Sequence, residues 1–193
     1  IVLFKEATKG YEDHETVMLE AHMDMVCEKN NDSTHDFSND PIELIEENGF
    51  LHADKTTLGA DDGVGVCYML ALLDDESLKH PALECVFTVQ EEVGLNGAMG
   101  LDKSILKAKK MIGLDSGEEE IITVSCSGGR RAVVEKELSY QKNELPCYQL
   151  YVGGLQGGHS GGVIHLERGN ANTIMARVYY HLSLNNIEFL LGS

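Results

Sequence analysis

Six titratable side chains in this sequence of 193 residues lie where apolar runs end or begin, and together they could hold metal ions. They are His22, Asp24, Asp61, Glu91, Glu92 and Asp115. One imidazole with several carboxylates and no thiolate suits zinc or manganese. Several carboxylates beside one histidine favour two metals, because one carboxylate can bridge both and another can act as general base on a water. Each of these residues taken alone is also explained as a helix cap or a solvated charge.

The elements that must position these side chains alternate between strands and helices. Strands are expected at residues 1–4, 16–21, 82–90 and 110–115. A helix is expected over residues 64–73, and a second helical stretch includes Leu101, Ile105 and Leu106. Strand, acid, helix, strand is the order typical of an α/β fold with a mixed, largely parallel sheet and flanking helices. Such sheets place their sites at the carboxyl ends of the strands.

The remaining segments predict a hairpin and a second domain. Residues 41–52 alternate around Asn48-Gly49, which predicts a β-hairpin after the polar loop 28–40. From about Cys126 the order of predicted elements changes. Strands are expected at 131–140, 148–153 and 187–191, a glycine-rich loop without a phosphate-binding Lys-Ser/Thr pair at 153–162, and an amphipathic helix after Asn170. We therefore expect a partial catalytic domain over 1–128 and a smaller, incomplete α/β lid domain over 129–193.

Composition excludes some partners. The formal net charge of −17 argues against nucleic acid and anionic membrane surfaces as partners. Five scattered cysteines without a Cys-x-x-Cys pair predict neither a disulfide framework nor a thiolate zinc site, and they fit a reducing cytoplasm. No signal peptide or membrane-length apolar run is visible. The first residue is Ile and an apolar run reaches the last residues, so we expect a fragment cut at both ends.

Five short stretches carry a family resemblance. They are AHMDMV at 21–26, LGADDGVG at 58–65, EEVG at 91–94, GLDS at 113–116 and GHSGG at 158–162. With these stretches in this order, the chain resembles the co-catalytic di-zinc peptidases that include carnosinase and the aminoacylases. Within that family it is most similar to the bacterial Xaa-His (aminoacyl-histidine) dipeptidases. The resemblance covers nearly the whole chain.

The resemblance implies a set of metal ligands. His22 and Asp115 would bind one zinc, Asp61 would bridge two zincs, and Glu92 would bind the second. Manganese and cobalt are the alternative metals. The resemblance also implies a cis peptide bond after the bridging Asp61. The family's last zinc-ligand histidine, near the C-terminus of the full protein, has no counterpart among these residues.

The resemblance implies three further roles. Glu91 would take a proton from the metal-bridging water, Asp24 would hold and tune His22, and His159 would stabilise the oxyanion from the lid. The implied activity is metal-dependent hydrolysis of Xaa-His dipeptides in the cytoplasm, with a small dipeptide as substrate and a homodimer formed through the lid domain. Two alternatives stay open: an acylamino-acid deacylase or carboxypeptidase with the same chemistry, and a non-catalytic fragment that lacks the last ligand.

Overall fold

The computed structural model describes every residue except 118, 119, 127, 129–131, 143, 145, 159–162, 192 and 193. The chain forms two compact units, Ile1–Gly128 and Gly129–Ser193, and each is described by itself. Among the described residues, no helix has the length and apolarity that crossing a bilayer requires.

A four-stranded sheet forms the centre of the first unit. Its order is β1 (Val2–Lys5), β5 (Leu83–Thr88), β2 (Val17–His22) and β6 (Lys110–Gly113). Strand β2 runs parallel to both β5 and β6, and β1 pairs antiparallel with β5. This topology confirms the predicted mixed, largely parallel α/β fold. Because β2 and β5 are parallel neighbours, the residues that follow them meet at one edge of the sheet.

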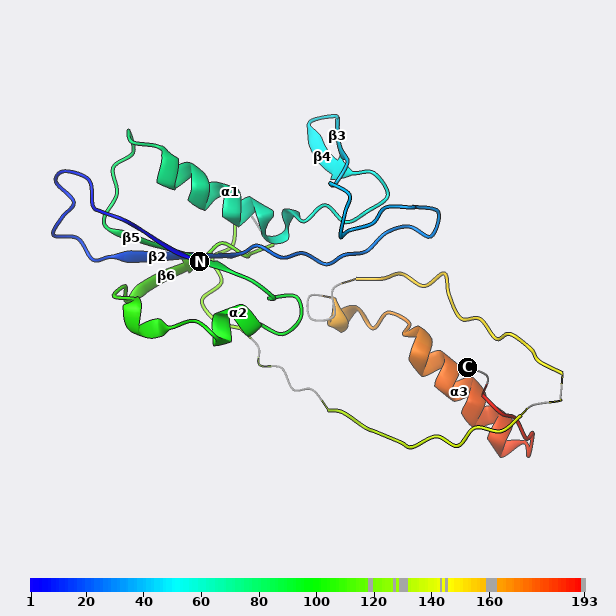
Figure 1. The fold of residues 1–193 in the computed structure, drawn as a ribbon. Helices are drawn as coiled ribbons and strands as arrows, with labels where there is room; N and C mark the ends of the chain where they lie inside the picture. The colour runs from blue at the N-terminus through cyan, green and yellow to red at the C-terminus, as the bar shows by residue number, and fades with distance from the viewer. Residues whose placement is uncertain are drawn as a thin grey trace. The chain divides into compact units, whose positions relative to one another are not determined.

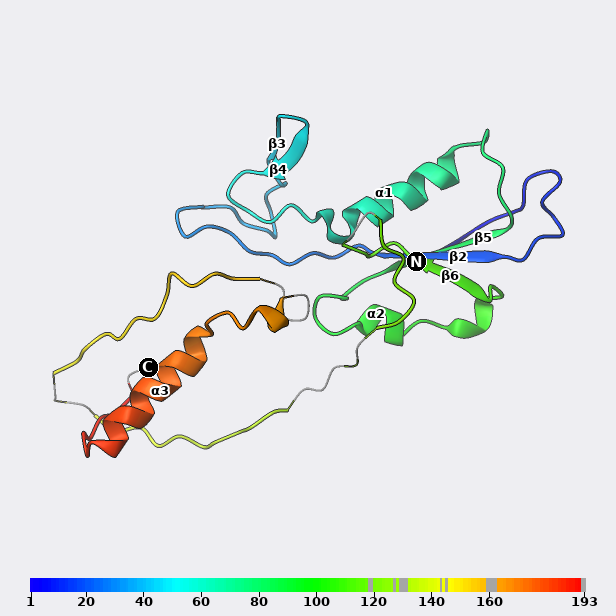
Figure 2. The ribbon, with the colours of Figure 1, turned by 180° about the vertical axis from the view of Figure 1, so that it is seen from behind.

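Helix α1 (Ala60–Asp74) covers one face of the sheet, and α2 (Asn96–Met99) lies on the other (Figures 1 and 2). The core under α1 contains the buried side chains of Leu19, Ala21, Met69, Leu83, Cys85 and Phe87. The prediction of a helix at 64–73 was right in kind but started late, since the helix already begins at Ala60 and bends at Asp61 and Asp62. All six residues of β5 are buried, as expected of a central strand covered on both faces.

The helical stretch predicted around Leu101 is wrong as a continuous helix. The chain instead forms the four-residue α2 and a short 3-10 helix, η1 (Lys103–Ile105). Helix α2 ends just before Gly100, and Asp102 starts η1 separately by accepting a hydrogen bond from the Ser104 N–H at 3.0 Å. Within α2, Gly97 sits so close to the backbone of Val89 that no Cβ would fit there. This close contact holds α2 against the end of β5.

The buried Glu84 in the middle of β5 ties the sheet to the segment before β6. Its two carboxylate oxygens accept hydrogen bonds from the backbone N–H groups of Lys107 and Ala108, at 2.8 and 3.1 Å. A buried carboxylate is tolerated only when its oxygens are satisfied in this way. Glu84 therefore helps to fix where β6 enters the sheet.

The predicted hairpin is confirmed. Strands β3 (Leu44–Glu47) and β4 (Phe50–Ala53) pair antiparallel around Asn48 and Gly49, whose φ angles are +54° and +80°. Positive φ at both central residues is what a tight hairpin turn demands, and Asn-Gly adopts it readily.

The second unit contains η2 (Ile164–Leu166) and the 14-residue helix α3 (Ala171–Leu184). The predicted helix is confirmed, and the Asn170 side chain caps it by accepting from the Thr173 N–H at 2.9 Å. The strands predicted at 131–140, 148–153 and 187–191 are wrong for the described residues, which are irregular. Apolar alternation favours a strand only where a neighbouring edge accepts its hydrogen bonds, and the described part of this unit provides none.

Candidate metal centre

His22 is the last residue of β2, and its side chain is only 2% exposed. Its Nδ1 lies 2.9 Å from the backbone oxygen of Asp24. A carbonyl only accepts hydrogen bonds, so Nδ1 carries the proton and Nε2 faces the acidic groups. Nε2 lies 2.9 Å from Asp61 Oδ1 and 4.0 Å from Asp115 Oδ2. Burial alone would lower the pKa of His22, but its hydrogen bonds to the Asp61 carboxylate and the Asp24 backbone and the charge of Asp115 raise it overall.

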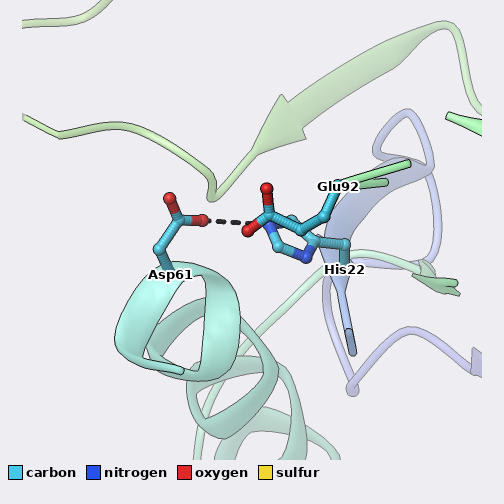
Figure 3. A group of neighbouring side chains, drawn as sticks. All are labelled: His22, Asp61 and Glu92. Atoms are coloured by element: carbon cyan, nitrogen blue, oxygen red, sulfur yellow. Dashed lines mark hydrogen bonds and ion pairs between the residues drawn. The ribbon is translucent and has the colours of Figure 1, made fainter. Parts of the chain in front are cut away.

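The sheet and α1 bring three of the predicted ligands together. Asp61 lies in the first turn of α1, and Glu92 follows the end of β5. One ligand atom each from His22, Asp61 and Glu92 lies within 4.8 Å of the other two (Figure 3). Zinc-to-ligand distances are about 2.0–2.2 Å for nitrogen and oxygen, so this set fits around one ion after small side-chain movements. The Asp61–Asp62 peptide bond is cis, which confirms that prediction.

Asp24 makes a different contact from the one expected. Its two carboxylate oxygens accept hydrogen bonds from the backbone N–H groups of Glu91 and Glu92, at 3.0 and 3.2 Å. The nearest approach of this carboxylate to His22 Nδ1 is 3.6 Å, so the main chain of Asp24 holds the imidazole more closely than its side chain does. Burial opposes ionisation of Asp24, but the two N–H groups lower its pKa overall. Its carboxylate therefore fixes the loop that carries both glutamates.

Glu91 is half-buried beside the three clustered ligands. Burial raises its pKa, the nearby charge of His22 lowers it, and the surrounding carboxylates raise it further. Its side chain also lines a mostly apolar cavity of about 290 Å³ on the α2 side of the sheet, together with Leu95 and Asp115. A carboxylate with a raised pKa beside a metal site is suited to accept and return protons.

Two acids near the site, the half-buried Glu20 and the buried Asp62, were not predicted. Glu20 precedes His22 by two residues on β2 and accepts a hydrogen bond from Thr88 Oγ1 at 3.1 Å, and burial raises its pKa. Asp62 is only 3% exposed and lies between α1 and the sheet. The two-residue period of the strand could have placed Glu20 beside the site, because residues i and i+2 share a face. Nothing local in the sequence distinguishes the buried Asp62 from the exposed Asp61.

One predicted site residue is not described. His159 and the neighbouring residues 160–162 of the glycine-rich loop lie outside the described residues.

A histidine and carboxylates that converge at the carboxyl ends of parallel strands could hold a divalent metal ion, so the unit is of the class of α/β proteins with a candidate metal site at this edge. The comparison with protein families identifies one family within that class. The model of peptidase family M20/M25/M40 matches residues 18–144, which include all of the described cluster, and the chain belongs to this family.

Three relatives are informative. The cytosol non-specific dipeptidase of Escherichia coli (strain K12) is 42% identical over 181 residues, covering 92% of this chain and 37% of the relative. An uncharacterized protein of Bacillus subtilis (strain 168) is 36% identical over 112 residues, covering 56% of this chain and 28% of the relative. The crystal structure of aminoacylhistidine dipeptidase from Vibrio alginolyticus matches with a TM-score of 0.65 at 35% identity, covering 92% of this chain and 36% of that one. The chain thus spans little more than a third of the length of these two dipeptidases.

Proposed function

We propose that the protein is a metal-dependent dipeptidase that hydrolyses Xaa-His dipeptides. The observation that carries the proposal is the convergence of His22, Asp61 and Glu92 from three separate segments, with their ligand atoms within 4.8 Å of one another. The family membership and the two named dipeptidase relatives support the same reaction.

The proposed site would hold two divalent cations, with zinc as the first choice. His22 and Asp115 would hold one, Glu92 the other, and Asp61 would lie between them, as the resemblance implies. When bound, such ions lower the pKa of water and polarise a carbonyl.

The chain's own residues would do the remaining work. Glu91 takes a proton from the attacking water and passes it to the leaving amine, and burial, which raises its pKa above the ordinary value, suits it to this exchange. Asp24 keeps Glu91 and Glu92 in place through their backbone N–H groups. His159 remains the proposed partner of the oxyanion, on the strength of the GHSGG stretch alone.

The relatives differ in their printed substrates, one being a non-specific dipeptidase and the other an aminoacylhistidine dipeptidase. Rates on β-alanyl-histidine, a dipeptide without histidine and an N-acetyl amino acid would separate Xaa-His preference, broad dipeptidase action and the deacylase alternative. A cytoplasmic location is proposed from the scattered cysteines and the cytosolic relative. A homodimer through residues 129–193 stays a prediction.

The decisive experiment replaces Glu91 with glutamine. We expect turnover of β-alanyl-histidine to fall by about 10²–10⁴-fold, the usual contribution of a general base, with metal content unchanged. Glu76→Gln, at an exposed glutamate after α1, is the matched control and should retain full activity. Activity of Glu91→Gln within threefold of the unsubstituted protein, at equal metal content, would exclude Glu91 as the base.

A further inference from the structure

Asp62 is buried, whereas the adjacent Asp61 is exposed. The Asp61 side chain is 73% exposed and faces His22, whereas Asp62 is only 3% exposed. The backbone at both residues departs from helical geometry, which turns the two adjacent carboxylates in different directions. Burying a carboxylate costs free energy unless its oxygens are hydrogen-bonded, so the contacts of Asp62 show what its burial achieves.

Segments that carry candidate metal ligands lie close to Asp62 and Gly65. Within α1, the Gly65 N–H donates to Asp62 Oδ1 at 3.2 Å. Burial raises the pKa of Asp62 overall, against the opposing effects of the Gly65 and His22 backbone N–H groups, and Asp62 Oδ2 has no hydrogen-bond partner among the described residues. Leu114, which precedes Asp115, packs against the same glycine.

Gly65 leaves the space that this arrangement requires. A Cβ built on Gly65 would lie 2.5 and 2.7 Å from the two Asp62 carboxylate oxygens and 2.8 Å from Leu114 Cβ. Real Cβ atoms do not approach other heavy atoms this closely, so any larger residue would displace the carboxylate or the helix. By contrast, a Cβ at Gly63 in the same helix would meet nothing within 4 Å.

We propose that Asp62, whose carboxylate packs against Gly65, is a positioning residue. It sets the spacing between the Asp61 carboxylate, the His22 imidazole and the segment that carries Asp115. The inference rests on the proposed metal centre and deepens it. Asp62 itself stays away from the metal and acts through the segments it joins. Groups of this kind typically change metal affinity by about 10–100-fold when they are removed.

The first test compares two alanine substitutions in one helix. Gly65→Ala should weaken zinc binding by about 10-fold or more, because the added methyl pushes against the Asp62 carboxylate. Gly63→Ala should leave zinc affinity unchanged, since its methyl enters open space. Affinity is measured by competition with a chelating dye, using zinc chloride and metal-free protein at a temperature where circular dichroism shows each variant to be folded. A change in stability alone does not alter this measurement.

The second test separates hydrogen bonding from volume at Asp62. Asp62→Asn keeps an acceptor for the Gly65 N–H and should bind zinc within about threefold of the unsubstituted protein. Asp62→Leu has a similar shape without an acceptor and should lose about 10–100-fold in affinity. Equal affinities for Gly65→Ala, Asp62→Leu and the unsubstituted protein would overturn the inference while leaving the metal centre intact. Absence of zinc uptake by the unsubstituted protein would instead remove the metal centre, and this inference with it.

Discussion

The carboxylate of Asp24 provides a stability prediction that needs no metal and no substrate. In Asp24→Ala both backbone N–H groups of the glutamate loop lose their acceptor. Hydrogen bonds to a charged group contribute about 1.5–3 kcal/mol each. The Asp24 side chain is 26% exposed and Glu92 is exposed, so water replaces part of the loss. We therefore expect less than the roughly 3 kcal/mol minimum for two such bonds, about 2 kcal/mol less free energy of unfolding at pH 7.

The same contacts predict a pH dependence. The pKa of Asp24 is lower in the folded chain than the ordinary value of 3.8, so the folded state favours the ionised form. Its contribution to stability is therefore complete above the unfolded pKa and is lost as the pH falls through the folded pKa. The difference in unfolding free energy between the unsubstituted protein and Asp24→Ala should shrink steadily below pH 3.8.

The assay is urea denaturation of metal-free protein, followed by circular dichroism at pH 7 and at several values below pH 4. Asp74→Ala, at an exposed aspartate that ends α1, is the control and should stay within about 0.5 kcal/mol of the unsubstituted protein, as is usual for surface substitutions. A loss below 0.5 kcal/mol for Asp24→Ala at pH 7 would refute the argument. So would a loss of full size that persists unchanged at the lowest pH, because it could not come from the ionised carboxylate.

Two further predictions concern the packing around the sheet. Gly97→Ala should lower the free energy of unfolding by about 2–3 kcal/mol, because its methyl would meet the backbone of Val89, whose nitrogen lies 2.7 Å from the ideal Cβ. Gly128→Ala, with open space around it, is the control in the same urea titration, and equal stability of the two variants would contradict the close contact. Glu84→Leu should cost about 2–4 kcal/mol, since two backbone N–H groups lose their acceptor. Glu84→Gln should recover about half of that loss in thermal melts, and a Leu variant that melts at the temperature of the unsubstituted protein would show that the carboxylate is dispensable.

The sheet and the convergence of the candidate ligands could be predicted because the local sequence pattern agrees with the fold there. The run before His22 is a buried strand that ends on a polar residue, and the same is true of the run before Glu91 and Glu92. The Asn48-Gly49 hairpin and the cap at Asn170 are equally local, so a few residues suffice to specify them.

The errors arise where the outcome depends on a distant partner. The apolar alternation after residue 131 needs a neighbouring strand, which the described residues of that unit do not supply. The position of α2 depends on the close packing of Gly97 against the backbone of Val89. In the same way, whether an acidic side chain is buried depends on which groups donate hydrogen bonds to it. The donors to Glu84 are 23 and 24 residues away in the sequence. No local window contains that information.

The distribution of the clustered ligands along the chain has a thermodynamic consequence. His22 and Asp61 are 39 residues apart and come from a strand and a helix, and Glu92 comes from a third segment. A denatured chain would have to close long loops to assemble them, so a divalent cation would bind the native state almost exclusively. By mass action, free metal at one hundred times its dissociation constant would add about 2.7 kcal/mol to stability. The supply of metal would then control how much folded protein a cell maintains.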